Sequence, residues 1–180
     1  MLAEAADALG WNRGAIRVLD IAAGNGVSGE ALAAAGLHPV LGTDIVPSAR
    51  EAALRDRPGL YDQYLTLDLL ALTGEQRTAI AALSANALSC VAPVGSHGSE
   101  LPPDVLVAAA GLLAPDALVV YMHDPQRDLP DAMTAETWTA GLGAGTEAEE
   151  LKRRRYVHRY TVNGEPFEMV GVVWRVRRAG

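Results

Sequence analysis

The sequence predicts an α/β protein: a three-layer sandwich in which helices cover both faces of a mostly parallel, seven-stranded sheet that ends in a C-terminal antiparallel hairpin. Short apolar runs alternate with helix-like stretches through most of the chain, which is typical of a parallel sheet flanked by helices. Asn163-Gly164 separates two strand-like segments and is a strong hairpin signal. A length of 180 residues indicates a single domain over residues 1–180.

The parallel strands are expected at five short apolar runs, each bounded by a turn or a helix signal. They are Ala15–Ile21, Pro39–Thr43, Tyr64–Leu69, Ala87–Ala92 and Ala117–Met122. The helices between them are indicated by capping residues, by proline at the start or by glycine at the end. They are Gly26–Ala35, a helix from the capping box Ser48-Ala-Arg-Glu51 to just before Pro58, Gly74–Leu83 after the capping box Thr73-Gly-Glu-Gln76, and Asp104–Leu113 after Pro102 and Pro103.

The pattern changes after the fifth strand. Pro125–Gly145 is rich in Pro, Gly, Asp and Thr, and is expected to be a loop with one helical turn near Trp138. Thr146-Glu-Ala-Glu149 matches a third capping box and predicts a helix with glutamates at its N-terminal end and Lys152–Arg155 at its C-terminal end, as the helix dipole favours. The closing hairpin is expected to consist of Tyr156–Val162 and Phe167–Val176.

Charge and composition exclude several classes of protein. The net charge of −7 argues against a nucleic-acid partner. No apolar run is long enough to span a membrane, and Met1–Gly10 has no basic residue, unlike a signal peptide. Cys90 is the single cysteine, which fits a reducing compartment, and the four histidines are scattered, so that we expect a cytoplasmic protein without a metal site.

The charge is unevenly distributed along the chain. Residues 151–180 contain eight basic and two acidic residues, a net charge of +6, so residues 1–150 carry −13. A helix C-terminus and a solvated strand explain the basic region. The alternative is a basic edge at which an anionic acceptor or an acidic partner docks.

A glycine-rich turn follows the first predicted strand. In Val18-Leu-Asp-Ile-Ala-Ala-Gly-Asn-Gly-Val-Ser-Gly29, three glycines satisfy G-x-G-x-x-G, whose default meaning is a dinucleotide site. Asp20 argues against NAD, since a pyrophosphate would meet its carboxylate, whereas a ligand with a cationic amino-acid group would be attracted. The other interpretation of Asp20 is a turn or capping residue. We expect cofactor contacts from Asp20, Ala22, Ala23, Gly24, Asn25 and Gly26.

Acidic residues also end the second and third predicted strands. Asp44 can accept hydrogen bonds from two ribose hydroxyls, or else cap the following helix. Asp68 can accept from an exocyclic adenine amine with Leu69 against the ring, or else stabilise a strand-end turn. Ligands of open α/β sheets bind at the carboxyl ends of the strands, where all three acids are expected to meet. Further cofactor contacts are expected from Ile45 and Val91.

These residues resemble the class I S-adenosylmethionine-dependent methyltransferases. The resemblance covers about Arg17–Val176 and rests on the glycine turn, Asp44, Asp68-Leu69, Ala87–Ala92 and the closing hairpin. It implies a Rossmann-like fold, S-adenosylmethionine as cofactor, and a fourth strand that borders the methyl-transfer site. Arg57-Pro-Gly-Leu-Tyr61 and Ser96–Pro103 are similar to the branch of Williams–Beuren-region methyltransferase-like proteins.

The chain departs from that pattern at Ala22, at Asn86, where an acid often begins the fourth strand, at Ala114-Pro-Asp116, which lacks the usual glycines, and in its N-terminal segment. Ala22 stands where the family usually has its first glycine. Only about fifteen residues precede the first predicted strand, whereas relatives usually carry N-terminal helices over the cofactor and the substrate. The N-terminal cap is therefore expected to be short or absent, and a homodimer could close the pocket instead.

The resemblance implies transfer of a methyl group to an O, N or C nucleophile of a small molecule, such as a metabolite or natural product. His97 is the candidate general base, because its ordinary pKa suits proton transfer near neutral pH; the alternative is a loop histidine without a task. His123 and Asp124 could line the acceptor pocket. Two other functions stay open: an S-adenosylmethionine-binding protein that acts as a cyclase or a non-catalytic partner, and an NAD(P)-binding oxidoreductase.

Overall fold

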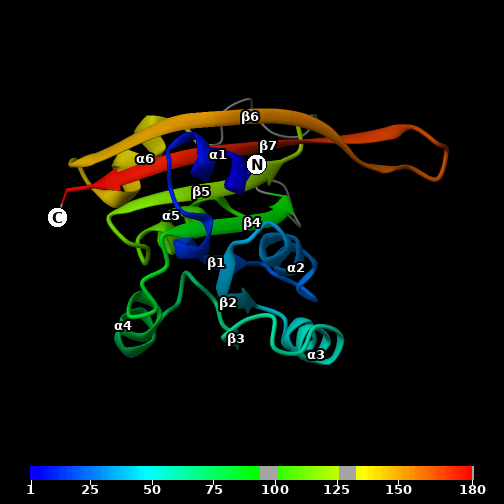
Figure 1. The fold of residues 1–180 in the computed structure, drawn as a ribbon, viewed down its shortest axis with the longest axis horizontal. Helices are drawn as coiled ribbons and strands as arrows, with labels where there is room; N and C mark the ends of the chain where they lie inside the picture. The colour runs from blue at the N-terminus through cyan, green and yellow to red at the C-terminus, as the bar shows by residue number, and fades with distance from the viewer. Residues whose placement is uncertain (94–100, 126–132, 180) are drawn as a thin grey trace.

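The structure, a computed structural model, describes residues 1–93, 101–125 and 133–179, and these contain one mixed sheet in the order β3-β2-β1-β4-β5-β7-β6 (Figure 1). Strand β7 runs antiparallel to both neighbours, and the other pairs are parallel. The predicted seven-stranded α/β fold with a reversed C-terminal strand is therefore confirmed. The strands are β1 Arg17–Ile21, β2 His38–Asp44, β3 Gln63–Thr66, β4 Ala87–Pro93, β5 Asp116–His123, β6 Thr146–Tyr160 and β7 Pro166–Arg178.

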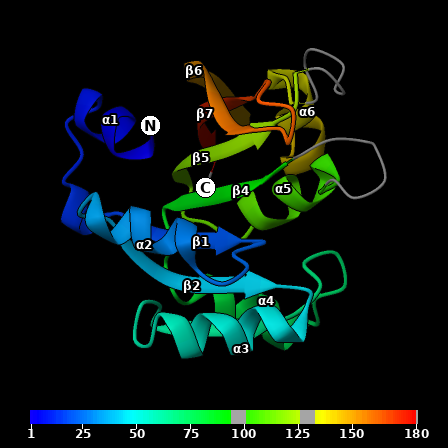
Figure 2. The same cartoon turned by 90° about the vertical axis from the view of Figure 1, so that its right-hand side faces the viewer.

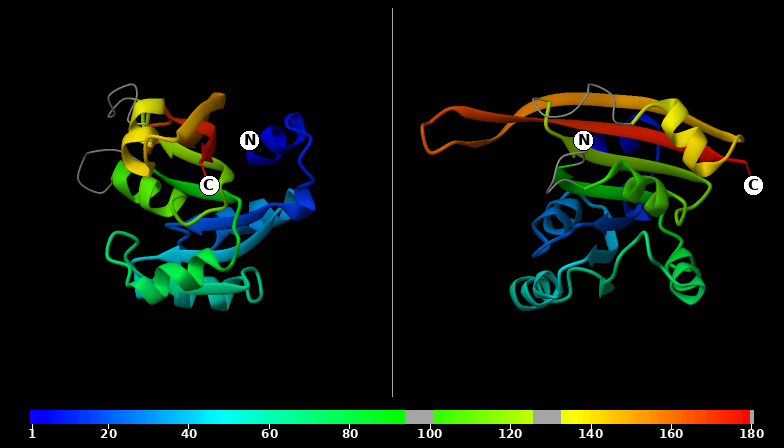
Figure 3. Two further views of the ribbon diagram at one scale, coloured as in Figure 1. Left: turned by 90° about the vertical axis from the view of Figure 1, so that its left-hand side faces the viewer. Right: turned by 180° about the vertical axis from the view of Figure 1, so that it is seen from behind.

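Helices lie on both faces of the sheet. The strand order reverses between β1 and β4, so right-handed crossovers place the earlier helices on one face and the later ones on the other. Figures 2 and 3 show α1 and α2 on one side of the sheet and α5 and α6 on the other. The helices are α1 Leu2–Ala8, α2 Val27–Ala34, α3 Pro47–Asp56, α4 Gly74–Ala81, α5 Pro103–Ala110 and α6 Ala135–Leu142, and a 3-10 helix covers Arg13–Ala15.

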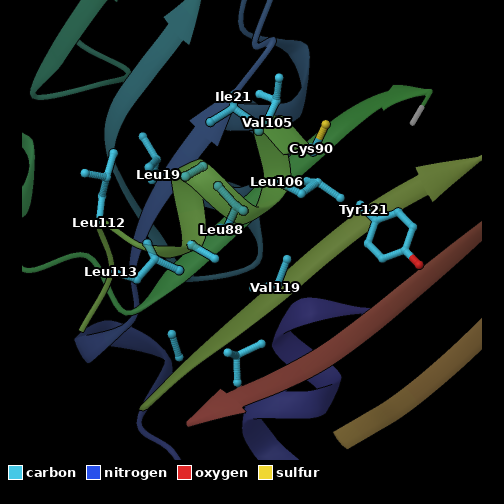
Figure 4. Close-up of a cluster of buried hydrophobic side chains, with 14 of the residues drawn as sticks. Leu19, Ile21, Leu88, Cys90, Val105, Leu106, Leu112, Leu113, Val119 and Tyr121 are labelled. Carbon is cyan, nitrogen blue, oxygen red and sulfur yellow. The ribbon is translucent and has the colours of Figure 1, made fainter. Parts of the chain in front are cut away.

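The largest core cluster lies between the sheet and the later helices. Leu19, Leu88 and Val119, from three neighbouring strands, are buried there together with Leu106 of α5 (Figure 4). Burial of apolar side chains at about 25 cal/mol per Å² makes this layer the main source of stability. The sheet is thereby held rigid below the edge at which its parallel strands end.

The helix predicted at Thr146-Glu-Ala-Glu149 and Lys152–Arg155 is wrong, because these residues form the first two thirds of β6. The capping-box pattern and the charge gradient are local signals. The ladder to β7 overrides them, since each residue gains a tertiary partner: Thr146 pairs with Arg178 and Glu147 with Arg177, whose side chains also form an ion pair of 2.9 Å.

Three smaller differences concern helices. Helix α3 begins with Pro47 after Val46, so Ser48 is not its cap, although the helix ends before Pro58 as predicted. Helix α6 is longer than the single turn expected; Thr134 caps it and Trp138 anchors it in the core. The N-terminal segment forms helix α1, which packs in a second core cluster with β1, β4, β5 and β7 residues.

The β6–β7 hairpin projects beyond the rest of the sheet. His123, the last residue of β5, is paired with Val170, which in turn is paired with Arg155. The hairpin residues between Arg155 and Val170 therefore have no β5 residue beside them (Figure 1). Since β4 and β5 are parallel, the projection lies at the carboxyl edge of the sheet, where ligands of this architecture bind.

Candidate cofactor and acceptor site

The glycine turn has the left-handed backbone that its sequence implies. Gly24 and Gly26 have φ angles of 56° and 88°, and the side on which Gly24 would carry a Cβ is open space. Ala22 also has a positive φ, of 49°, and this backbone conformation is strained for alanine. It is the position at which the methyltransferases that the sequence resembles usually have glycine. The Ala23 amide donates to the Thr43 carbonyl at 2.9 Å and fixes the turn beside β2.

Asp20 lies beneath this turn and is completely buried. Its Oδ2 accepts hydrogen bonds of 2.7 Å from Ser28 Oγ and from Tyr61 Oη. Its Oδ1 has no hydrogen-bond partner within the part of the chain that the structure describes. Burial raises the pKa of Asp20 to about 6, although interactions with the hydroxyls of Ser28, Tyr61 and Ser89 oppose the shift. The site therefore holds a buried carboxyl group that is ionised above about pH 6 and whose Oδ1 has no hydrogen-bond partner among the described residues.

Tyr61 reaches Asp20 through a gap left by two glycines. A Cβ on Gly29 would lie 2.3 Å from Tyr61 Oη, and one on Gly42 would lie 3.0 Å from Tyr61 Cζ. Tyr64 lies edge-to-face with Tyr61, and its hydroxyl donates to the Gly24 carbonyl at 2.6 Å. Gly29, the third glycine of the sequence motif, thus leaves room for the side chain of Tyr61 and not for a ligand.

Arg57 adds a further contact from the same segment. Its guanidinium donates to the Asn25 carbonyl at 3.0 Å and to Glu30 at 2.8 Å. Sequence reasoning missed Ser28, Tyr61 and Tyr64 as members of the site. The segment Arg57-Pro-Gly-Leu-Tyr61 could have predicted Tyr61 as a site residue, but in the sequence it indicates only a similarity to one branch of the family.

Asp44 ends β2 beside the glycine turn. One carboxylate oxygen accepts from the Gly24 amide at 3.0 Å and the other accepts from the Val46 amide at 3.0 Å. The structure thus brings Asp44 and the glycine turn together. Each oxygen of an ionised carboxylate can accept a second hydrogen bond, so capacity remains for a ligand diol.

The residues expected to contact an adenine lie just after the carboxyl ends of β2 and β3, and they differ in solvent exposure. Asp68 is exposed, and its Oδ1 accepts from the Leu70 amide at 2.9 Å, so it does stabilise a strand-end turn. Leu69 is buried in the main core, which leaves it little surface for a ring. Ile45 is 65% exposed and offers the larger apolar surface.

A cavity of about 490 Å³ adjoins the turn on the α1 and α2 side of the sheet. Its wall includes Ala22, Ala23 and Ser28 from the turn and the start of α2, and Ser89 and Val91 from β4. This volume lies within the usual range for small-molecule sites. Val91 thus lines the same cavity as the glycine turn, and its contact with the cofactor stays a prediction.

The candidate catalytic residue His97 lies outside the residues that the structure describes. His123 and Asp124 are buried at the carboxyl end of β5. Among residues 1–93, 101–125 and 133–179, no three His, Cys, Asp or Glu side chains are grouped so as to hold a metal ion. None of the described helices is long and apolar enough to span a membrane.

The basic C-terminal region is largely paired with acidic side chains. These ion pairs join Arg153 to Glu150, Arg155 to Glu168, Arg175 to Asp116, and Arg177 to Glu147, while Lys152 and Arg154 both face Glu4. These ion pairs neutralise much of the charge, which agrees with the solvated strand in the simpler interpretation. The helix C-terminus in that interpretation is wrong, because Lys152–Arg155 lie in β6. Arg154 differs from the others, because it shares its acid, Glu4, with Lys152.

No protein-family model and no curated protein sequence matches the chain. Solved structures do match along nearly its whole length. A TehB-like S-adenosylmethionine-dependent methyltransferase from Corynebacterium glutamicum is 20% identical, with a TM-score of 0.58 and coverage of 98% of this chain and 86% of that one. An S-adenosylmethionine-dependent methyltransferase from Anabaena variabilis is 16% identical, with a TM-score of 0.62 and coverage of 99% and 86%.

A proposed RNA methyltransferase from Pyrococcus horikoshii is also similar, with 13% identity, a TM-score of 0.63 and coverage of 99% of this chain and 82% of that one. At such identities the likeness defines the fold. The chain has the class I S-adenosylmethionine-dependent methyltransferase fold, as its strand order and reversed β7 also show. Membership of the Williams–Beuren-region branch stays a prediction.

Proposed function

We propose that the protein binds S-adenosylmethionine and transfers its methyl group to an O, N or C nucleophile of a small molecule. The observation that carries this proposal is the position of Asp44, which is hydrogen-bonded to the glycine turn at the carboxyl edge of a methyltransferase-type sheet. In this proposal Asp44 binds the ribose diol and the backbone of Gly24–Gly26 borders the amino-acid end. The methyltransferases among the similar structures support the cofactor.

The residues present fit a cationic cofactor. Asp20 supplies a buried negative charge and an oxygen without a partner in the described part of the chain. A cationic amino-acid group or a sulfonium gains from that field, whereas the pyrophosphate of NAD(P) is repelled. When bound, S-adenosylmethionine supplies an electrophilic methyl group, and this chain orients the cofactor and excludes water. His97 is proposed as the base for an acceptor that must lose a proton.

Calorimetric titration with S-adenosylhomocysteine and with NAD tests the proposal. We expect micromolar binding of the first and none of the second. Asp44→Ala should weaken S-adenosylhomocysteine binding at least about tenfold, because hydrogen bonds to a charged acceptor contribute about 1.5–3 kcal/mol each. Asp62→Ala is the matched control, since Asp62 is an exposed acid paired with His38 before β3 begins.

Two outcomes would contradict the proposal at different levels. Binding of NAD without S-adenosylhomocysteine would replace it with an oxidoreductase. Tight binding of S-adenosylhomocysteine, with methyl transfer to RNA and to no small molecule in a labelled-methyl assay, would retain the cofactor and change the acceptor class. Full-strength binding by Asp44→Ala would remove Asp44 from the site.

A further inference from the structure

A second cavity, of about 300 Å³, lies on the far side of Val91 from the glycine turn. Its wall includes Val91, Val120, Met122, Gly171, Tyr156 and Arg154, contributed by β4, β5, β7 and β6. Val91 and Val120 also line the larger cavity beside the turn, so the two cavities adjoin. A volume near 300 Å³ is at the lower end of the range for small-molecule sites.

The shape of this cavity is set by the sheet. It extends across four neighbouring strands, which at a spacing of about 4.8 Å cover about 14 Å. A slot of about 300 Å³ has room for one ring or one short alkyl chain.

The walls of the slot are mainly apolar. Val120 and Met122 come from β5, and the Tyr156 hydroxyl lies against Met122 Sδ. Met1 also lines the cavity and lies over Gly171, where a Cβ would be 2.7 Å from Met1 Sδ. Burial against these walls favours an apolar ligand body.

A positive charge lies at the β6 end of the slot. Lys152 and Arg154 share the single carboxylate of Glu4. Lys152 is the closer partner, and it is the largest cause that lowers the pKa of Glu4 to about 2, ahead of the N-terminal amine and Arg154. Arg154 Nη2 is 3.3 and 3.5 Å from the Glu4 oxygens, and its side chain is 50% exposed. The N-terminal amine is also 3.7 Å from Glu4 Oε2, so these three cations exceed the acid by two charges.

We propose that this slot holds the acceptor of the methyl transfer, and that the acceptor is a small, mainly apolar carboxylate whose anionic group binds Arg154. The inference rests on the proposed function, since it places the reacting end of the acceptor at Val91, beside the cofactor. Charge complementarity to Arg154 favours an acid over a neutral molecule, and the apolar lining favours a mainly apolar ligand over a hydrophilic one.

Paired probes that differ in one group test this assignment. Binding of 3-phenylpropanoate and of 3-phenylpropan-1-ol is measured by calorimetry, with and without saturating S-adenosylhomocysteine. We expect the carboxylate to bind the wild-type protein about tenfold more tightly than the alcohol. Arg154→Gln should reduce that ratio to about one. Val120→Phe should weaken both probes, because it fills part of the slot, while thermal unfolding and the circular dichroism spectrum report whether that variant is folded.

Arg155→Gln is the matched control, because it removes the same charge from the neighbouring residue of β6, which pairs with Glu168 and does not line the cavity. Equal binding of acid and alcohol by the wild type, binding of neither, or equal effects of Arg154→Gln and Arg155→Gln would overturn the inference. A dimer seen in sedimentation that Val120→Phe dissociates would assign the slot to a second copy. If the wild-type protein does not bind S-adenosylhomocysteine, the proposed function fails. The ratio of acid to alcohol affinity, measured without S-adenosylhomocysteine, still decides whether Arg154 binds a carboxylate.

Discussion

Replacement of Asp20 by asparagine should stabilise the protein above neutral pH. The pKa of this carboxyl is raised on folding from 3.8 to about 6 because the side chain is buried. A raised pKa means that its contribution to stability is fully present below pH 3.8 and is lost as the pH rises through 6. Two pKa units correspond to about 3 kcal/mol. The amide oxygen of the introduced asparagine can still accept from Ser28 and Tyr61, so the substitution removes mainly the cost of a buried charge.

Urea unfolding at pH 4, 5.5 and 8 measures this effect. The difference in unfolding free energy between Asp20→Asn and the wild type should be small at pH 4 and approach about 3 kcal/mol at pH 8. The same variant should bind S-adenosylhomocysteine more weakly, so stability and binding change in opposite directions. Asp62→Asn, at an exposed site, should change stability by about 0.5 kcal/mol or less. A difference for Asp20→Asn that is the same at all three pH values would refute the buried-charge argument.

Three further substitutions test the turn and one helix, each by chemical unfolding. Gly29→Ala should cost about 2 kcal/mol, because its Cβ meets Tyr61 at 2.3 Å, and adding Tyr61→Leu should recover part of that loss; strictly additive effects would contradict the contact. Ala22→Gly should stabilise by about 1 kcal/mol, since it relieves a positive φ of 49°, and a loss of stability would contradict strain at this residue. Thr73→Ala should cost about 1 kcal/mol, because it removes the side-chain cap of α4, and an unchanged stability would show that the cap is redundant.

The parallel part of the fold could be predicted because its strands are buried on both faces. Such strands are almost continuous apolar runs, and Val18–Ile21, Ala87–Cys90 and Ala117–Val119 are almost fully inaccessible to solvent, including the polar residues Asp20 and Ser89. The carboxyl ends of these strands then had to meet at one edge. This is why Asp20, Asp44 and the glycine turn could be grouped correctly from their positions after successive strands.

The edge strand β6 could not be predicted in the same way. It has one neighbour, β7, and most of its side chains are exposed, so its sequence lacks an apolar pattern. Its charges form ion pairs across β7 and with α1, and these contacts join residues far apart in the sequence. A local pattern of glutamates followed by arginines is equally compatible with a helix, and only the pairing with β7 decides between the two.

The glycine motif shows how one sequence pattern can have two physical causes. Gly24 and Gly26 are required by positive φ angles at the turn, which is the usual reason for such glycines beside a ligand. Gly29 is required for a different reason, because Tyr61 occupies the space of its side chain and donates to Asp20. The resemblance to a dinucleotide motif therefore depends on a glycine that serves an internal contact. The acids at the strand ends, rather than the third glycine, carry the information about the ligand.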